Sequence, residues 1–533
     1  MDHGIYPMKT AHHHVSSDHN SNGSAGPKVE VDSFMDRDER EMAVLGKKQQ
    51  LKRNFGFMSI LGFSCTLMVT WEGMFCVFIY GLTDGGPAGL VYGYIFCWLG
   101  YFAVVVSLAE LVSMAPTAGG QYHWVYLLAP PSSRKFLSYI TGWQSIVAWQ
   151  ACLASAAYLG GTIIQGLLVL NYPNYQFERY QGTLLLYAVM ALAVLFNTYL
   201  AKHLPKVEGA ILIIHIVGFF AILITMTYLA PHGSAKDVFA TFLKAGGYES
   251  QGLAFFVGII TTVFAFLGAD GAIHMCEEIK NASTIVPWSL MTSIALNGAL
   301  GFAMLFAILF CIGDIHNALD SPTGFPFIEI FTQATRSVHG ATAMTALVLS
   351  LMIFATIAVL AAASRQMWAF ARDRGVPGSR FIGRVEPRTK LPLYAIGTTT
   401  VITLLLALIN IGSTAAFNAV ASLLVAGFLA SYMIPIGLLL WKRVRGDKIR
   451  YGPWRLGKAG VLANGFSMVW CVIAMFFSFW PTEVPVTAQT MNWSCLLYGA
   501  TMIFSVLFYV FYGRFRYNGP IVETSVVEQM RGA

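Results

Sequence analysis

Residues 266–272 read FLGADGA, and this polar stretch interrupts a run of apolar residues that extends from 251 to 276. Glycine permits backbone conformations that a helix does not contain, so the glycines on both sides of Asp270 predict a break in a helix. The alternative is an aspartate that caps a short internal kink, which would mark the same break. The candidate site residues of this stretch are Phe266, Gly268, Ala269, Asp270 and Gly271.

A second apolar run, residues 55–80, carries the polar stretch Thr70, Trp71, Glu72 and Gly73. A charged side chain at the middle of a bilayer costs about 2.5–3.5 kcal/mol on insertion scales, so Glu72 must face protein, water or a ligand. The alternative is a protonated or hydrogen-bonded Glu72 that bridges two helices. Broken helices are tolerated at membrane depth only where they line a cavity or are buried in protein, so both stretches predict a ligand site.

The whole chain is built from apolar runs of this kind. It is 56% hydrophobic and only 11% charged, whereas soluble domains carry about 25% charged residues. Runs of about 20 residues cross the ~30 Å hydrocarbon core of a bilayer, and in hydrocarbon they must be helices. The alternating segments of a β-barrel are not seen. The predicted helices are residues 55–80, 88–114, 137–168, 182–200, 207–230, 251–276, 287–312, 341–371, 392–412, 415–441, 459–480 and 493–513.

We therefore predict an all-α polytopic membrane protein with twelve transmembrane helices. The interrupted runs are the first and the sixth, which is the spacing of a five-plus-five inverted repeat whose broken helices point to the binding site. The predicted organisation is a disordered tail at 1–45, a membrane domain at 55–515 with repeats at 55–230 and 251–441 and extra helices at 459–480 and 493–513, and a tail at 516–533.

Basic residues gather in alternate loops. Arg179, Lys236, Lys244 and Arg336 are the few that fall in the other set of loops. Cytoplasmic loops carry the excess of Lys and Arg, so this asymmetry predicts that both termini are cytoplasmic. The net charge of +7 is then a property of these loops and does not indicate nucleic acid. The basic groups of the predicted cytoplasmic loops lie at residues 47–53, 134–135, 202–206, 280, 372–390, 442–458 and 514–516.

Other polar residues carry weaker signals. His215, inside the run 207–230, is either a satisfied core residue or a group that handles protons, because histidine titrates near neutral pH. His274, Glu277 and Glu278 lack the HExxH spacing of a zinc site, and we expect the glutamate pair to end the sixth helix at the cytoplasmic surface. The eight cysteines form no CxxC pair and predict no metal or disulfide framework.

Enzymatic chemistry has no support in the sequence. We find neither a phosphate-cradling P-loop nor a nucleophile elbow, so we predict no enzyme activity and no cofactor.

Several motifs together resemble the amino acid–polyamine–organocation superfamily. Residues 116–124 (PTAGGQYHW), after 109–111, resemble its helix 2–3 signature. Residues 268–278 with Val286 and Pro287 resemble the helix 6 signature of its fungal amino acid/choline branch. The motif at the end of helix 8 is matched by Ser364, Arg365, residues 369–373 and Pro377. The start of helix 9 is matched by residues 390–392.

The resemblance implies a LeuT-type fold of ten core helices plus two, alternating access, and symport driven by an ion gradient, with protons as the expected ion. It implies that substrate binds between the broken parts of helices 1 and 6, at Thr70–Gly73 and Gly268–Gly271. His215 matches a position that is lysine in some bacterial relatives, near the ion-coupling site. His215 and Asp270 are therefore the expected ion-coupling residues. The expected partners of the protein are the substrate, the coupling ion and membrane lipid.

Helix 1 departs from the glycine-rich pattern of the general amino-acid transporters. Trp71 and Glu72 occupy that region, and this pair resembles the choline-transporter-like subgroup. An acidic group repels a carboxylate and pairs with a cation, and an aromatic face attracts a quaternary ammonium by about 0.5–2 kcal/mol. We expect choline first, then γ-aminobutyrate, with polyamines or general amino acids as alternatives.

Three other protein classes compete with a transporter. A nutrient receptor could keep the fold and signal instead of transporting, but such proteins often carry long soluble extensions, and both tails here are short. A membrane enzyme would need a catalytic constellation. A carrier of two six-helix halves would not favour breaks in helices 1 and 6. The expected location is the plasma membrane, with a vacuolar membrane as the alternative.

Overall fold

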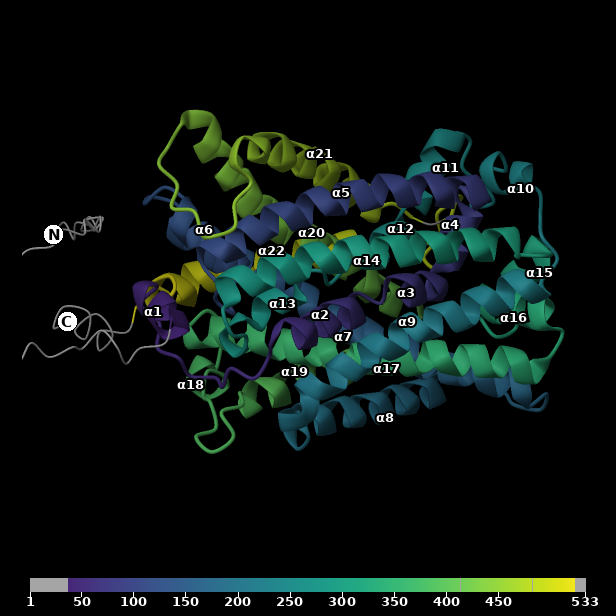
Figure 1. Ribbon diagram of the computed structural model, residues 1–533, viewed down its shortest axis with the longest axis horizontal. Helices are drawn as coiled ribbons and strands as arrows, with labels where there is room; N and C mark the ends of the chain where they lie inside the picture. The colour runs from purple at the N-terminus through teal and green to yellow at the C-terminus, as the bar shows by residue number, and fades with distance from the viewer. Residues whose placement is uncertain (1–36, 413, 482, 523–533) are drawn as a thin grey trace, which may run out of the picture.

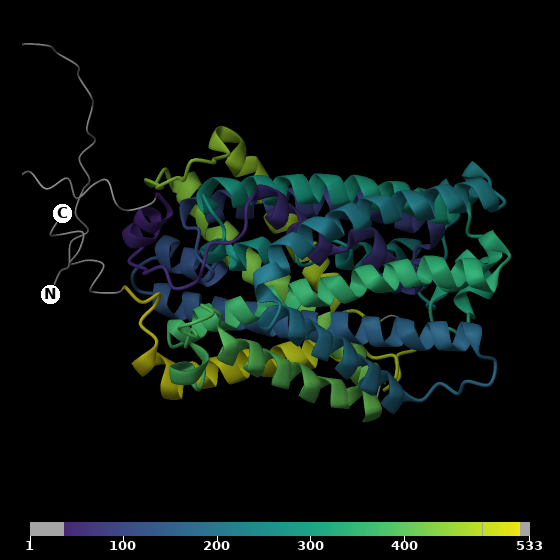
Figure 2. The same ribbon diagram turned by 60° about the horizontal axis from the view of Figure 1, so that its bottom comes forward.

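The computed structural model describes residues 37–412, 414–481 and 483–522, and among them it contains α-helices and short helical turns but no β-strand. Figure 1 shows the long helices lying side by side along one axis, and Figure 2 shows the same arrangement after a turn of 60°. The prediction of an all-α protein is confirmed. The predicted tails at 1–36 and 523–533 lie outside the described residues.

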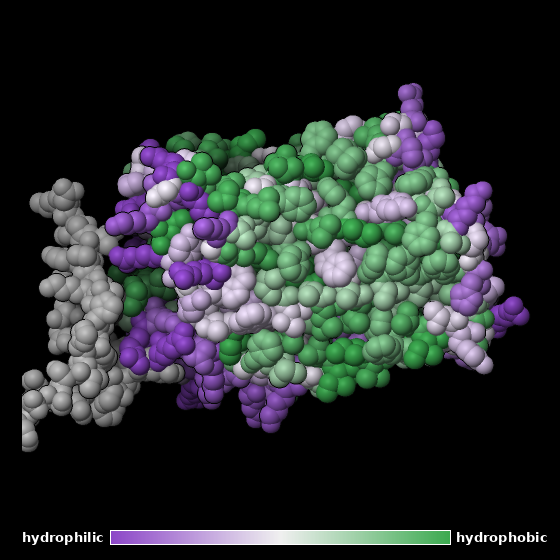
Figure 3. All heavy atoms as spheres, turned by 45° about the horizontal axis from the view of Figure 1, so that its top comes forward, coloured by the Kyte–Doolittle hydropathy of each residue, from purple (hydrophilic) through white to green (hydrophobic). Residues whose placement is uncertain are grey.

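Eleven helices of the described chain are long and apolar enough to cross a membrane. The sixth predicted run falls short because a break divides it, leaving the apolar pair α11 (Gln251–Gly258) and α12 (Ile260–Phe264). Figure 3 shows a hydrophobic band between two hydrophilic ends, as a bilayer requires. The eleven are α2 (Phe57–Met68) with α3 (Thr70–Cys76), α5 (Gly86–Met114), α7 (Arg134–Asn171), α8 (Arg179–Thr198), α9 (Leu204–Leu229), α14 (Ala282–Phe310), α17 (Val338–Arg372), α19 (Leu393–Gly412), α20 (Thr414–Arg445), α21 (Gly460–Ser478) and α22 (Ser494–Phe508).

The bundle has two distinct ends. The helix α1 (Arg37–Val44) and the last helical turns, η5 (Tyr509–Gly513) and α23 (Arg514–Arg516), lie at one of them (Figure 1), which we call the terminal end. The opposite end carries α4 (Phe78–Thr83), α10 (Ala235–Phe239), α15 (Ile315–Leu319) and α16 (Pro326–Thr335).

Part of the predicted N-terminal tail is folded. Residues 37–44 form α1, whose Asp38 and Met42 are buried. The carboxylate of Asp38 accepts a hydrogen bond from the backbone N–H of Asn281. The prediction of disorder up to residue 45 was wrong there, because it was drawn from the lack of an apolar period and could not include this tertiary contact. Near the C-terminus of the chain, Tyr517 is also buried, within the segment 516–533 that was predicted to be a tail.

The two broken helices meet each other. α3 contacts α12, and α2 contacts α13 (Gly271–His274). An isolated parallel bridge between Phe55 and Ile279 joins the terminal-end limits of both runs. The fold therefore places the breaks together in the interior, while the proposed repeat boundaries stay a prediction.

Candidate functional site

The break in the first run lies one residue earlier than its polar stretch suggests. Val69 separates α2 from α3 with a φ of 37°, a left-handed conformation. Such a conformation strains a β-branched residue. Thr70–Gly73 are not the break itself, as we had expected, but the first turn of α3. The strained residue is apolar, so the sequence pattern pointed to the polar residues beside it.

Glu72 is fully buried and is bonded to the helix α9. Its Oε1 lies 2.6 Å from Nδ1 of His215. The other ring nitrogen, Nε2, lies 3.2 Å from Oδ1 of Asn297 on α14. The amide of Asn297 donates from Nδ2 to the carbonyl oxygen of Cys65, while Glu72 Oε2 has no partner among the described residues. The structure thus brings together two of the predicted residues, Glu72 and His215.

This network determines where the protons of the pair can sit. Because the amide of Asn297 donates to Cys65, its oxygen faces His215, and Nε2 must carry a hydrogen to bond it. The short contact between Nδ1 and Glu72 then holds one more proton, on either partner. The pair is neutral with that proton and carries one negative charge without it. Glu72 and His215 therefore form a single protonation site.

Trp71 and Thr70 pack against neighbouring helices. The ring centroid of Trp71 lies 5.7 Å from that of His215 and 6.3 Å from that of Phe219. The methyl group of Thr70 packs closely against Gly301 of α14, because a Cβ added to this glycine would lie only 2.9 Å from that methyl group. Neither polar atom, Thr70 Oγ1 nor Trp71 Nε1, has a partner in the described part of the chain.

The break in the sixth run covers residues 265–270, between α12 and α13. Gly268 has a φ of 79°, and a Cβ on Gly268 or Gly271 would collide with the side chain of Leu67. Both glycines are therefore needed, because they let α2 approach the break. Ala269 is buried, and Phe266 packs on the ring of Tyr94 at 5.1 Å.

Asp270 is buried and accepts hydrogen bonds on both oxygens. The amide of Gln121 donates to Oδ2 at 2.6 Å, and the hydroxyl of Tyr432 donates to Oδ1 at 2.6 Å. Nε2 of His274 lies 3.3 Å from Oδ2. Asp270 thus connects α6 (Gln121–Leu128), α13 and α20. It lies in a network separate from that of Glu72.

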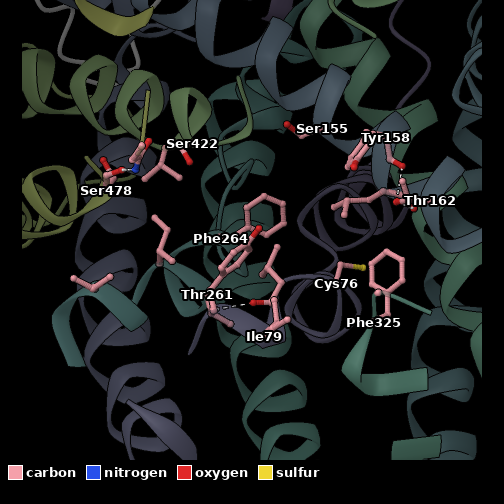
Figure 4. A pocket seen from close by; sticks show the side chains of 18 of the residues that line it. Cys76, Ile79, Ser155, Tyr158, Thr162, Thr261, Phe264, Phe325, Ser422 and Ser478 are labelled. Carbon is pink, nitrogen blue, oxygen red and sulfur yellow. Dashed lines mark hydrogen bonds between the residues drawn. The ribbon is translucent and has the colours of Figure 1, made fainter. Parts of the chain in front are cut away.

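A cavity of about 330 Å³ (Figure 4) is lined in part by Ile79 and Tyr80 of α4, which lies at the opposite end of the bundle. None of the predicted site residues lines it. Phe264 lines the cavity and also approaches the first break, since a Cβ on Gly73 would come within 3.9 Å of its ring. Cys76, which also lines the cavity, donates from Sγ to the carbonyl oxygen of Glu72. Glu72 therefore lies about one helical turn along α3 from the cavity wall.

The cavity wall contains residues that the sequence analysis missed. Ser155, Tyr158 and Thr162 of α7 face it, with Phe264 and Thr261 of α12 opposite (Figure 4). The three α7 residues recur at a spacing of three and four, which places them on one helix face. That polar stripe in an apolar run was the available signal.

Buried ion pairs close the terminal end. Lys47 Nζ donates to Asp373 Oδ1 at 2.6 Å, and the hydroxyl of Tyr122 donates to Oδ2 at 2.8 Å. The backbone N–H of Ile521 also donates to this carboxylate. Burial opposes ionisation of Asp373, but the charges of Lys47 and Arg372 outweigh it and hold the pKa of Asp373 below its ordinary value.

The glutamate pair after the sixth run belongs to the same closure. Arg372 donates to both oxygens of Glu277 at 2.8 and 2.9 Å, and Arg365 donates to Glu278 at 2.7 Å. Burial is the largest single influence and raises the pKa of Glu277. The charge and hydrogen bonds of Arg372, together with the charge of Lys47 and the backbone N–H of Ala118, outweigh it and hold this pKa below its ordinary value. Our expectation that this pair ends the helix at the surface was wrong, because α17 supplies arginines that allow it to be buried. We call these ion pairs, with Lys47–Asp373, the terminal lock.

Comparison with known proteins identifies similar chains. Residues 55–501 match a family model described as amino acid permease. A putative amino acid/polyamine transporter of Macrophomina phaseolina is 34% identical, covering 82% of this chain and 96% of the relative. A choline transporter of Saccharomyces cerevisiae is 32% identical, covering 94% and 88%. Amino-acid permease 2 of Neurospora crassa is 26% identical, covering 95% and 93%.

Proposed function

Since this chain belongs to the amino acid permease family, and is thus an integral membrane transporter and not an enzyme, we propose that it is a secondary active proton symporter. Its proposed substrate is a small amine or amino acid, with a choline-like or γ-aminobutyrate-like compound favoured. Polyamines and general amino acids are the alternative substrates.

The observation that carries this proposal is the position of the Glu72–His215 pair. The pair is buried at the break of the first run, between the cavity on one side and the terminal lock on the other. Alternating access requires a central site that one barrier at a time separates from each side of the membrane. Here the thin barrier is Phe264, and the thick barrier is the terminal lock.

A cationic substrate suits the charge of this site. When the pair has lost its shared proton it carries a negative charge, and Glu72 Oε2 has no partner among the described residues. The cavity above supplies aromatic side chains, Tyr158, Phe264 and Phe325, of the kind that attract quaternary ammonium groups. The relative from Saccharomyces cerevisiae is named a choline transporter, which supports the same substrate class.

We propose the residues of the two breaks as the substrate site, and His215 with Asp270 as the ion-coupling residues. His215 is better placed than Asp270 for coupling, because both oxygens of Asp270 are already bonded. The proposed location is the plasma membrane, or a vacuolar membrane, with the terminal end in the cytoplasm. The basic loops near this end support that orientation.

Uptake by the full-length protein in reconstituted vesicles tests the proposal. We expect the wild type to concentrate labelled choline or γ-aminobutyrate when an inward proton gradient is imposed. Glu72→Gln should lower uptake of the cation at least about tenfold, which corresponds to about 1.4 kcal/mol, while Glu178→Gln, at an exposed glutamate, should leave it unchanged. Undiminished choline uptake by Glu72→Gln would exclude the pairing. Binding without flux would favour the nutrient receptor.

A further inference from the structure

Glu208 is a buried acid that the site described above does not use. It lies on α9, its exposed fraction is 0%, and neither of its carboxyl oxygens has a hydrogen-bond partner in the described chain. Close contact between helices buries it, because a Cβ on Gly62 of α2 would collide with the carbonyl oxygen of Glu208. An unpaired buried carboxylate is very costly, and such a group takes up a proton instead. In this conformation Glu208 therefore holds a proton.

Glu208 shares a helix face with His215. The two residues are seven positions apart, which is two helical turns and about 10 Å along the axis. Glu208 lies on the terminal-end side, five positions from His203 and two from Lys206, both of which are exposed. It is thus placed between the Glu72–His215 pair and the solvent at the terminal end.

An apolar layer separates the two protonation sites. A hydrophobic cluster of Leu61, Cys65 and Leu212, with Ile216 and Leu296 packed against it, joins α2, α9 and α14 at this level. Leu212 lies between Glu208 and His215 on α9, and Cys65 accepts the hydrogen bond from Asn297. The cluster offers no side chain that would conduct a proton readily, so it keeps the two sites apart in this conformation.

The charged groups nearest to Glu208 along the chain, Lys202, His203 and Lys206, are exposed to solvent, and those on the other helices packed against α9 are paired or lie near helix ends. On α2 and α14 no charged side chain occurs, and the titratable group of α2 is Cys65. On α17, Arg365 and Arg372 are paired with glutamates of the terminal lock, and His339 lies near the start of that helix. On α16, Glu329 accepts a hydrogen bond from Gln333 near the opposite end.

We propose that Glu208 is a second proton-binding site, which receives the proton of the Glu72–His215 pair and releases it at the terminal end. This inference rests on the proposed function. In the first step the terminal end opens, and the acid of Glu208 gives its proton to water and becomes a carboxylate. In the second step the apolar layer parts, and the pair passes its shared proton to that carboxylate. The pair changes from neutral to one negative charge, and Glu208 returns to the neutral acid.

The test compares proton movement with substrate exchange in vesicles that contain the full-length protein and a pH-sensitive dye. Wild type should acidify the lumen while it takes up labelled substrate. Glu208→Gln should exchange labelled for unlabelled substrate at nearly the wild-type rate but acidify the lumen at least tenfold more slowly. The matched control Glu39→Gln, at an exposed glutamate, should acidify normally.

Each outcome separates this inference from the function on which it rests. Acidification by Glu208→Gln at the wild-type rate overturns the inference and leaves symport intact. Uptake by the wild type without acidification overturns both. If Glu208→Gln does not fold, Glu208→Asp decides, because a shorter acid should keep acidification but shift its pH dependence. An unchanged pH profile in Glu208→Asp contradicts a relay.

Discussion

The two broken helices each bring one buried carboxylate to the centre of the protein, and they use it differently. Asp270, in the sixth run, is bonded to groups on three helices through both oxygens. Glu72, in the first run, bonds His215 through one oxygen and leaves the other without a partner in the described chain. A buried carboxylate with both oxygens bonded is held in place, whereas one with an unbonded oxygen can change partners. The sixth break therefore acts as a clamp, and the first break is the part that responds to protons and ligands.

The largest effect should come from removing the clamp. Asp270→Ala leaves the donors of Gln121 and Tyr432 buried without an acceptor, and each such loss costs about 1–3 kcal/mol. We expect the unfolding free energy of the purified protein to fall by more than about 3 kcal/mol, measured by thermal unfolding in detergent. Glu72→Ala should cost clearly less. Equal losses would remove the distinction between the two breaks.

The second effect concerns the continuation of the sixth run into the terminal lock. Glu277→Gln leaves Arg372 buried without its charged partner. Breaking such a pair outright costs about 3–5 kcal/mol, and we expect a smaller loss than in Asp270→Ala because the amide oxygen introduced at 277 can still accept a hydrogen bond from Arg372. Because the folded protein holds the pKa of Glu277 below its ordinary value of 4.5, the pair stabilises the fold above that pH, and the stability is lost as pH falls through the lowered pKa.

Thermal unfolding of wild type and Glu277→Gln should therefore differ most near pH 7 and converge in acid. Glu386→Gln, a partly exposed glutamate in the loop after α17, should show no such dependence. A difference that does not change with pH would mean that the contact acts by packing and not by charge.

The smallest change in stability should come from the first break, together with a clear change in function. His215→Gln keeps a polar group beside Glu72 but cannot titrate, so we expect a loss of about 1 kcal/mol in thermal unfolding. Uptake measured between pH 5 and pH 8 should lose its pH dependence. A wild-type pH profile would return His215 to the role of a core residue, and Asn297, its other partner, would not be part of coupling.

Much of this arrangement could be predicted from local sequence. The helix limits follow from apolar runs, and α19 begins within one residue of the prediction at 392. The glycines around Asp270 predicted a break, and the backbone breaks there. The position of the other break was missed by one residue, because Val69 looks like any apolar residue and only the fold puts it in a left-handed conformation.

The partners of the polar residues could not be predicted in this way. Nothing in the sequence marked Glu208, two residues from Lys206, as a buried acid, and only its packing against Gly62 reveals that it is buried. Glu277 and Glu278 looked like a surface helix end, since their arginine partners lie far along the chain on α17. The cavity residues Ser155, Tyr158 and Thr162 form a polar stripe in the sequence, but only the fold, which places α12 opposite them, shows that the stripe lines a cavity.

The sequence by itself determined that this protein is an α-helical membrane protein broken in its first and sixth spans, because hydrophobic length and glycine act locally along the chain. Only the tertiary structure decided which of the two carboxylates is held fast and which keeps an oxygen that no described residue bonds. That choice depends on donors from residues as distant as Gln121 and Tyr432, which packing brings together and no local pattern records.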